Sequence, residues 1–262
     1  MIDIDAIRKC LETSILKLTI MTYNEVDSTN TIAKEQILEG TDEGLLIIAE
    51  SQRMGRGRKD RHWYSPLGGL YFSLVLKPRL GIINAPLMGL LASCATAQGL
   101  RAIGTQHTYV KWPNDILLDF DKVAGILSEI VTLNQDRHLV IIGIGINQNS
   151  TASDFPEDFF YSTTTVRDHL GRLTSREELL CHIINSFDNL LRIVVSENSF
   201  KAIIQTWKAL SSTLGNRVRI TEGSEIFTGT AVDILDDGSL LVKTDEGEKI
   251  VTTGDVRHLR ND

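Results

Sequence analysis

The chain contains little cysteine and no excess of positive charge. Its 262 residues include three cysteines, and 34 acidic residues outnumber 27 basic ones, for a formal net charge of −7. This balance provides no general field for DNA or an anionic membrane, so any anion site must be local. Cys10, Cys94 and Cys181 lie far apart without CxxC or Cys/His spacing. That excludes the usual zinc sites and favours a reducing compartment with buried thiols.

Long hydrophobic runs and common nucleotide motifs are also missing. The N-terminal "MIDIDAIRKCLE" has no apolar signal-peptide core, and the apolar run at 85–97 is too short to span a bilayer. We therefore expect a cytoplasmic protein that does not act at a membrane. There is no GxxxxGK[ST], and neither "GRGRKD" nor "GIGINQ" has the third glycine of a dinucleotide fingerprint.

The hydrophobic patterning predicts an α+β protein with two domains. Alternating or continuous apolar segments predict strands over 18–26, 44–50, 70–78, 109–118, 122–131 and 138–147. Helical spacing predicts helices over 4–11, 28–38, 86–103, 175–195 and 200–210. From residue 217 onward, short strands alternate with Glu-Gly and Asp-Gly turns, the pattern of a small barrel. The predicted domains are 1–212 and 213–262.

The loop "SQRMGRGRKDRHWYSP" concentrates cations within this acidic chain. Its Gly-Arg repeat leaves the backbone accessible, and Arg56, Arg58 and Arg61 supply planar donors suited to phosphate or carboxylate. Such a loop is expected to be mobile until an anion orders it, and Trp63 can then cover an aromatic ligand. A solvated turn would have the same charge content, but the repeated Gly-Arg pattern argues against it.

Three other stretches carry polar groups or bare backbone. In "VIIGIGIN", alternation puts Gly143, Gly145 and Asn147 on one strand face, which a flat ligand, another backbone or a packed helix could cover. "KWPNDILL" places Asn114 and Asp115 at a turn, where Asp115 can offer oxygen to Mg²⁺. Lys122 heads "VAGIL" and is either a partly desolvated anion contact or a solvated strand end. "DSTN" can bind a ligand or cap the next helix.

Together these pieces resemble the biotin protein ligases. "DSTN", "SQRMGRGRKDRHW", "SPLGGLYFSL", "KWPNDI", "KVAGIL" and "IGIGIN" occur in that family's order, and the resemblance extends over nearly the whole chain. It implies the biotin–lipoate ligase fold, related to class II aminoacyl-tRNA synthetases, with a C-terminal SH3-like barrel. It also implies a two-step reaction. Biotin and MgATP form biotinyl-5'-AMP, and the biotinyl group then passes to a lysine of a biotin carboxyl carrier protein, such as the acetyl-CoA carboxylase subunit.

The resemblance also assigns roles to residues. Cations must offset the repulsion between the biotin carboxylate and the α-phosphate, and Lys122, Arg58 and Arg56 match the catalytic positions. The matches to biotin-binding positions are Ser28, Thr29, Asn30, Gln52, Arg56, Gly57, Arg58, Lys122, Gly143 and Gly145. The matches to ATP-binding positions are Arg56, Arg58, Arg61, Trp63, Asn114, Asp115, Lys122 and Asn147, with Asp115 as the Mg²⁺ ligand.

Family members that repress transcription carry a DNA-binding domain before the catalytic domain. Here about 26 residues precede "DSTN", so we expect a ligase that does not bind DNA. Homodimerisation, common in the family, is left open. A lipoate or octanoate transferase is the nearest rival, and the Gly-Arg loop favours biotin. The acidic balance disfavours a clamp for single-stranded nucleic acid, and a pure adaptor function leaves the Arg-rich loop unexplained.

Overall fold

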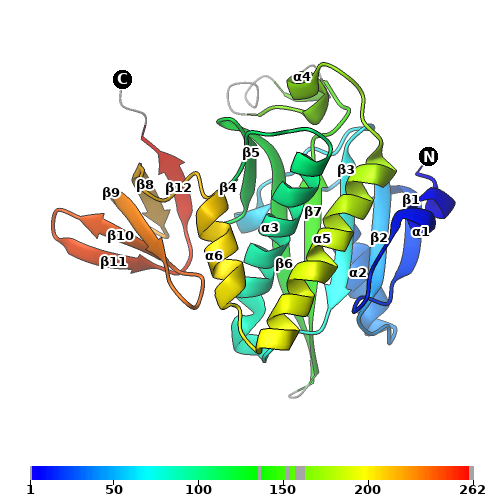
Figure 1. Cartoon of the computed structure of the whole chain (residues 1–262), viewed down its shortest axis with the longest axis horizontal. Helices are drawn as coiled ribbons and strands as arrows, with labels where there is room; N and C mark the ends of the chain where they lie inside the picture. Colours follow the sequence, from blue (N-terminus) through cyan, green and yellow to red (C-terminus); the bar gives the residue numbers. More distant parts are fainter. Residues whose placement is uncertain (1, 135–136, 152–153, 157–162, 260–262) are drawn as a thin grey trace.

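The computed structural model describes residues 2–134, 137–151, 154–156 and 163–259, and its larger part is built on a seven-stranded mixed sheet (Figure 1). In spatial order the strands are β1 (Thr19–Val26), β2 (Leu45–Gln52), β3 (Leu70–Leu76), β7 (Arg137–Ile146), β6 (Asp121–Asn134), β5 (Asp115–Leu118) and β4 (Thr108–Lys111). β1 and β2 are parallel, and the other neighbours are antiparallel. Because side chains alternate along a strand, the sheet has two separate packing faces.

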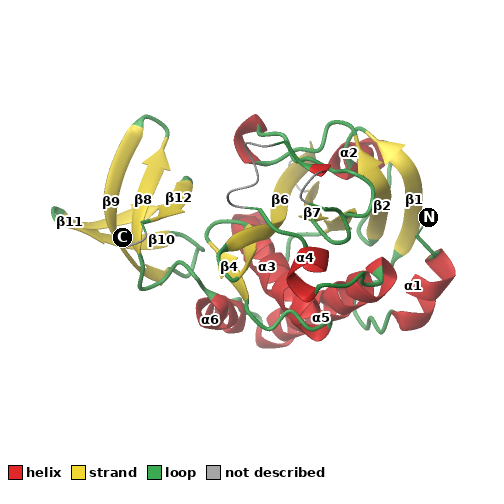
Figure 2. Cartoon of the chain, turned by 90° about the horizontal axis from the view of Figure 1, so that it is seen from above, coloured by secondary structure: helices red, strands yellow, loops and turns green. Residues whose placement is uncertain are grey.

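Helices cover these two faces unequally (Figures 1 and 2). The helices α3 (Ala85–Ala102) and α5 (Arg176–Glu197) cross one face, with α1 (Ile4–Cys10) near β1 and α6 (Lys201–Leu210) near β4. α2 (Thr29–Leu38) lies on the opposite face. The large hydrophobic core fills the space under α3 and α5, and a smaller cluster lies under α2. The short helices are η1 (Arg58–Asp60), η2 (Ile82–Asn84) and α4 (Val166–Leu170).

The sequences of α3 and α5 explain how closely they pack. In α3, Gly99 faces α5, where an added Cβ would lie 3.0 Å from the backbone nitrogen of Ile183, so glycine permits the close approach. α5 begins with Ser175, whose hydroxyl accepts a hydrogen bond from the Glu178 amide at 3.1 Å. Within the described residues, α5 is the one helix long and apolar enough to cross a membrane. Its apolar side chains pack into the protein core.

The predicted mixed sheet flanked by helices is confirmed, with one local difference and one helix that was not predicted. The segment 109–118 forms two antiparallel strands, β4 and β5, instead of one. Pro113 lies in the turn between them, and it has no amide hydrogen for a strand ladder. The helix α4 was not predicted, because its five residues are too few to show helical periodicity.

Residues after α6 form a five-stranded antiparallel sheet of order β11-β10-β9-β8-β12, as the alternating pattern predicted. The strands are β8 (Arg217–Glu222), β9 (Glu225–Ile234), β10 (Leu240–Thr244), β11 (Gly247–Val251) and β12 (Asp255–His258). This sheet has contacts with the larger part: Trp112 Nε1 donates to the Gly238 carbonyl at 3.1 Å, and Lys208 Nζ lies 2.6 Å from Asp233 Oδ1. The start of β12 lies beside the Arg-rich loop, where Lys59 pairs with Asp255.

The cysteines differ from the expectation of three buried thiols. Cys10 of α1 and Cys181 of α5 form a disulfide, with their Cα atoms 5.9 Å apart. Only Cys94 is a free, buried thiol, and burial raises its pKa to about 12. The pair was missed because its members are 171 residues apart in the chain, and only the packing of α1 on α5 brings them together.

Candidate functional site

A cavity of about 540 Å³ opens on the α2 side of the sheet. It is lined by the start of α2, the Arg-rich loop, the β4–β5 hairpin, parts of β6 and β7, and the start of β12. Every site residue predicted from the sequence lines this cavity, although these residues span positions 28 to 147. The predicted candidates therefore form one constellation.

The glycine face of β7 forms part of the cavity. Ile142, Ile144 and Ile146 point into the main core, so Gly143 and Gly145 face the α2 side. Two side chains lie against these glycines. A Cβ added to Gly143 would overlap the side-chain amide of Asn30. A Cβ added to Gly145 would overlap the Trp63 ring. Glycine is required here because neighbouring side chains occupy the space of its missing Cβ.

A third glycine belongs to this face and was not predicted. Gly125 of β6 pairs with Gly145 of β7, and an added Cβ would lie 3.2 Å from Trp63 Cζ3. Lys122 Nζ lies 5.2 Å from the centre of the Trp63 ring, a cation–π distance. The indole nitrogen of Trp63 is buried and has no hydrogen-bond partner in the described part of the chain. Trp63 thus connects the glycine face with the cationic end of the cavity.

The opposite end of the cavity is lined by neutral hydrogen-bonding groups. The Gln52 carbonyl oxygen accepts from the Thr29 amide at 2.9 Å, and Gln52 Nε2 donates to Ser65 Oγ at 2.8 Å. Ser73 Oγ lies 2.7 Å from Thr29 Oγ1. Ser28 stands at the N-cap of α2, but its hydroxyl makes no capping hydrogen bond, so a capping role does not account for it. This end suits a ligand with neutral N–H and C=O groups.

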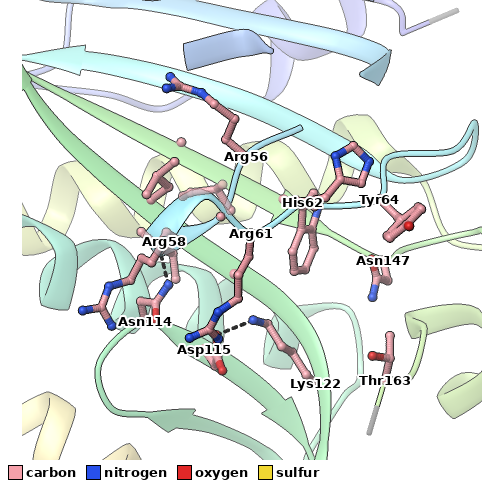
Figure 3. Close-up of a pocket in the computed structure, with 18 of the residues that line it drawn as sticks. Arg56, Arg58, Arg61, His62, Tyr64, Asn114, Asp115, Lys122, Asn147 and Thr163 are labelled. Carbon is pink, nitrogen blue, oxygen red and sulfur yellow. Dashed lines mark hydrogen bonds and ion pairs between the residues drawn. The ribbon is translucent and has the colours of Figure 1, made fainter. Parts of the chain in front are cut away.

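Lys122 and Asp115 mark the charged end. Lys122 Nζ lies 2.5 Å from Asp115 Oδ1, and Figure 3 shows these two partly buried side chains paired with each other. Asn114 Nδ2 donates to the Ile126 carbonyl at 2.8 Å, which fixes the hairpin against β6. Asn147 Nδ2 donates to the Thr164 carbonyl, while its Oδ1 is buried and has no partner among the described residues. Lys122, Asp115 and Asn147 thus bring a cation, a carboxylate and an amide oxygen to this end.

Lys111 adds a second lysine that sequence reasoning did not select. Its side chain lines the cavity from β4. Burial lowers the pKa of Lys111, and the nearby Asp115 partly opposes that effect. The motif "KWPNDI" contains the evidence for this lysine. Lys111 directly precedes the Trp-Pro turn and Asp115 directly follows it, so the two residues are paired across the hairpin.

The C-terminal sheet reaches the Arg-rich loop through its strand β12. Arg58 Nη1 donates to the Gly254 carbonyl at 3.1 Å, and both Lys59 and Arg61 form ion pairs with Asp255. Burial lowers the pKa of the Arg58 guanidinium. Burial alone would raise the pKa of Asp255, but hydrogen bonds from Arg61 and Lys59 hold it below its usual range. No motif predicted this contact, because Asp255 is one acidic residue among many in the C-terminal region.

The Arg56 side chain points in a different direction from those of Arg58 and Arg61 (Figure 3). Figure 3 shows its side chain pointing away from Lys122 and Asp115. Its guanidinium pairs instead with Glu129 of β6, with an Nη2–Oε2 distance of 2.9 Å. The loop thus sends Arg58 and Arg61 toward one end of the cavity and Arg56 toward the other.

The described residues contain no cluster of three or more His, Cys, Asp or Glu side chains able to hold a metal ion alone. Asp115 is the carboxylate nearest Lys122, as the 2.5 Å pair shows. Mg²⁺ is usually bound by one or two carboxylates together with substrate phosphates and water. The residues present fit a Mg²⁺ ion that arrives with a nucleotide.

Comparisons with known proteins agree with this geometry. A model of the biotin/lipoate A/B protein ligase family matches residues 23–147, and one of the biotin protein ligase C-terminal domain matches residues 213–259. The bifunctional ligase/repressor BirA of Bacillus spizizenii is 34% identical over 251 residues, covering 95% of this chain and 77% of that protein. The biotin–[acetyl-CoA-carboxylase] ligase of Mycobacterium tuberculosis is 28% identical, covering 90% and 87%.

A solved structure is also similar throughout the chain. The biotin protein ligase of Aquifex aeolicus, in complex with biotin and ATP, superimposes with a TM-score of 0.78 and 31% identity. The match covers 93% of this chain and 99% of that structure. Both the main sheet and the C-terminal sheet are therefore shared.

Proposed function

The chain belongs to the biotin/lipoate A/B protein ligase family and is an ATP-dependent biotin–protein ligase, and on that premise we propose how its residues divide the work. In the first step a biotin carboxylate oxygen bonds to the α-phosphorus of ATP, and the bond to pyrophosphate breaks. In the second, an acceptor lysine amine attacks the acyl carbon, AMP leaves, and the amine loses a proton. The observation that carries the proposal is one cavity with a neutral hydrogen-bonding end and a cationic end.

The neutral end holds the biotin ring system. Ser28 offers a hydroxyl without a capping bond, and Gln52 and Thr29 are fixed by their mutual hydrogen bond. A ring with urea-like N–H and C=O groups matches these donors and acceptors. Gly143 and Gly145 leave room on this face of β7 for the side chains of Asn30 and Trp63, which the cavity places beside the ligand.

The cationic end holds the reacting groups. A carboxylate and a phosphate repel each other, and Lys122 and Arg58 offset that repulsion where charge develops. Arg58 is oriented by its hydrogen bond to the Gly254 carbonyl, so little reorganisation is needed when the substrates react. Trp63 and Asn147 lie on the nucleotide side. Asp115 would hold Mg²⁺, which screens the phosphate charge when bound.

The two parts of the chain divide this function. We assign most of the biotin and ATP site to the domain 1–212, while the C-terminal domain 213–262 adds Asp255 to the cavity wall and anchors the loop through it. The acceptor is the biotin carboxyl carrier domain of acetyl-CoA carboxylase. Support for this comes from the relatives that are biotin–[acetyl-CoA-carboxylase] ligases.

A pyrophosphate exchange assay tests the proposed function. We expect the purified protein to exchange labelled pyrophosphate into ATP when biotin is added and not when biotin is omitted, because the exchange requires reversible adenylate formation. Lipoate and octanoate serve as matched competing acids. Exchange with lipoate but not with biotin would rule out the proposal and favour a lipoate or octanoate transferase.

Asp255→Asn tests the contribution of the C-terminal domain. The variant keeps one acceptor oxygen but loses the charge that pairs with Lys59 and Arg61, and we expect the KM for ATP to rise about three- to tenfold. The effect is modest because all three side chains are partly exposed. Asp233→Asn is the matched control, since Asp233 pairs with Lys208 away from the cavity. Equal KM values for the two variants would show that Asp255 has no role in ATP binding.

A further inference from the structure

Glu129 is a carboxylate to which the proposed function assigns no task. It lies on β6, where its Oε1 and Oε2 accept hydrogen bonds from Arg56 Nη2 at 3.1 and 2.9 Å. Its Oε2 also accepts a hydrogen bond from Asn30 Nδ2 at 2.6 Å. Its side chain is 31% exposed. One carboxylate thus joins the Arg-rich loop to a residue at the neutral end of the cavity.

Asn30 is held by the protein on both sides of its amide. Its Nδ2 donates to Glu129 and, at 3.4 Å, to the Leu127 carbonyl, while its Oδ1 accepts from Ser73 Oγ at 2.6 Å. Both N–H groups are therefore used within the protein, and Asn30 retains a single acceptor lone pair for a ligand. Its position depends directly on Glu129.

The hydrogen bonds continue from Asn30 across the floor of the neutral end. Ser73 links Asn30 to Thr29, Thr29 links to Gln52, and Gln52 Nε2 reaches Ser65 at the far end of the loop. Ser65 Oγ in turn donates to the Trp63 carbonyl at 3.1 Å. The network therefore begins at one end of the Arg-rich loop, at Arg56, and returns to it at Ser65 and Trp63.

We propose that Glu129 is a positioning residue that couples biotin occupancy to closure of the Arg-rich loop, through its simultaneous contacts with Arg56 and Asn30. This inference rests on the proposed function. When the loop lies over the cavity, Glu129 is neutralised by Arg56. When the loop moves away, the carboxylate keeps only the neutral Asn30 as a partner, which is an unfavourable arrangement for a partly buried charge.

This coupling assigns Arg56 a task different from that of Arg58. Arg58 is directed at the C-terminal domain and the charged end, whereas Arg56 closes the neutral end by pairing with a fixed strand residue. A biotin ring that fills the space beside Asn30 holds the network in place and favours the closed loop. A closed loop in turn slows the escape of biotin, because the two effects are reciprocal.

Glu129→Gln is the test, since glutamine has the same shape and can still accept from Asn30. We expect the KM for biotin in the exchange assay to rise about tenfold. This is the low end of the effect of losing a charge-assisted hydrogen bond, because both groups are partly exposed. The kcat should change less than about threefold, because Glu129 does not contact the reacting atoms. Biotin should also protect the loop from trypsin less well than it does in the wild-type protein.

Two further variants make the result specific. Arg56→Gln removes the charge that pairs with Glu129, at a side chain that is itself exposed. This variant should show the same rise in the KM for biotin, and the double variant Arg56→Gln/Glu129→Gln should show no further rise. Glu25→Gln is the matched control: it removes a Glu–Arg pair of the same loop, to Arg53, that does not reach Asn30. It should behave as the wild type.

Unchanged KM for biotin and unchanged protection in Glu129→Gln would overturn the inference, as would fully additive effects in the double variant. If the wild-type protein shows no biotin-dependent exchange, the proposed function fails instead. The loop anchor is then judged by trypsin cleavage without ligand. Faster cleavage in Glu129→Gln than in Glu25→Gln supports the anchor, and equal cleavage contradicts it.

Discussion

Replacing Lys122 with alanine lowers the rate of biotinyl-adenylate formation by about 100-fold, because it removes an oriented cation from the place where two anions meet. The full range for loss of such a group is about 100- to 1,000-fold. The lower end applies here because the Lys122 side chain is 32% exposed, and water and the nearby Arg58 partly replace its charge. The rate is measured as single-turnover adenylate formation with saturating biotin and ATP.

The matched control for this variant is Lys208→Ala. Lys208 also forms a close ion pair with an aspartate, at 2.6 Å, and its side chain is 25% exposed, but it does not line the cavity. It should leave adenylate formation unchanged. If Lys122→Ala forms adenylate at the rate of the control, Lys122 does not stabilise the charged transition state.

Replacing Gly145 with valine lowers biotin-dependent exchange by about 30-fold or more, because the new side chain overlaps the Trp63 ring. The strain falls on the loop that carries Trp63. The core is spared, since the neighbouring isoleucines of β7 point to the other face of the sheet. Thermal unfolding followed by circular dichroism should therefore show a folded protein with reduced exchange activity.

A graded series sharpens this prediction. Gly145→Ala places a Cβ in overlap with Trp63, whereas Gly125→Ala places one 3.2 Å from Trp63 Cζ3, a contact that a small shift relieves. We expect the loss of exchange to follow the order Gly145→Val, Gly145→Ala, Gly125→Ala. Wild-type exchange in Gly145→Val would mean that the position of Trp63 against β7 is not needed for catalysis.

Local patterns were enough to predict most elements of the fold. Period-two alternation identified the glycine face of β7, and the Ala- and Leu-rich run identified α3 within one residue at each end. These predictions succeeded because a strand or helix is specified by the spacing of its own apolar residues. The turn predicted at "KWPND" is present within 109–118, but the antiparallel pairing of β4 with β5 depends on contacts that the pattern of either half does not specify.

The sequence motifs predicted a set of residues that line one cavity, but they did not select Lys111, Gly125 or Asp255, and they did not predict the contacts between side chains. Motif residues between 28 and 147 line one cavity, as their chemistry suggested. The orientation of each side chain depended on partners that no motif contains. Arg56 turns to Glu129, 73 residues away, and Lys59 pairs with Asp255, 196 residues away.

By itself the sequence determined which chemistry is available: a local group of cations in an acidic chain, bare glycine backbone and neutral hydrogen-bonding residues. It did so because residue type and short-range spacing are written directly in the chain. Only the tertiary structure decided how these groups are divided between two ends of one cavity. It also decided that Glu129 and Asp255 pair with the Arg-rich loop and that Cys10 and Cys181 form a disulfide. Those contacts arise where packed strands and helices bring distant residues within a few ångströms, and sequence spacing carries no record of that distance.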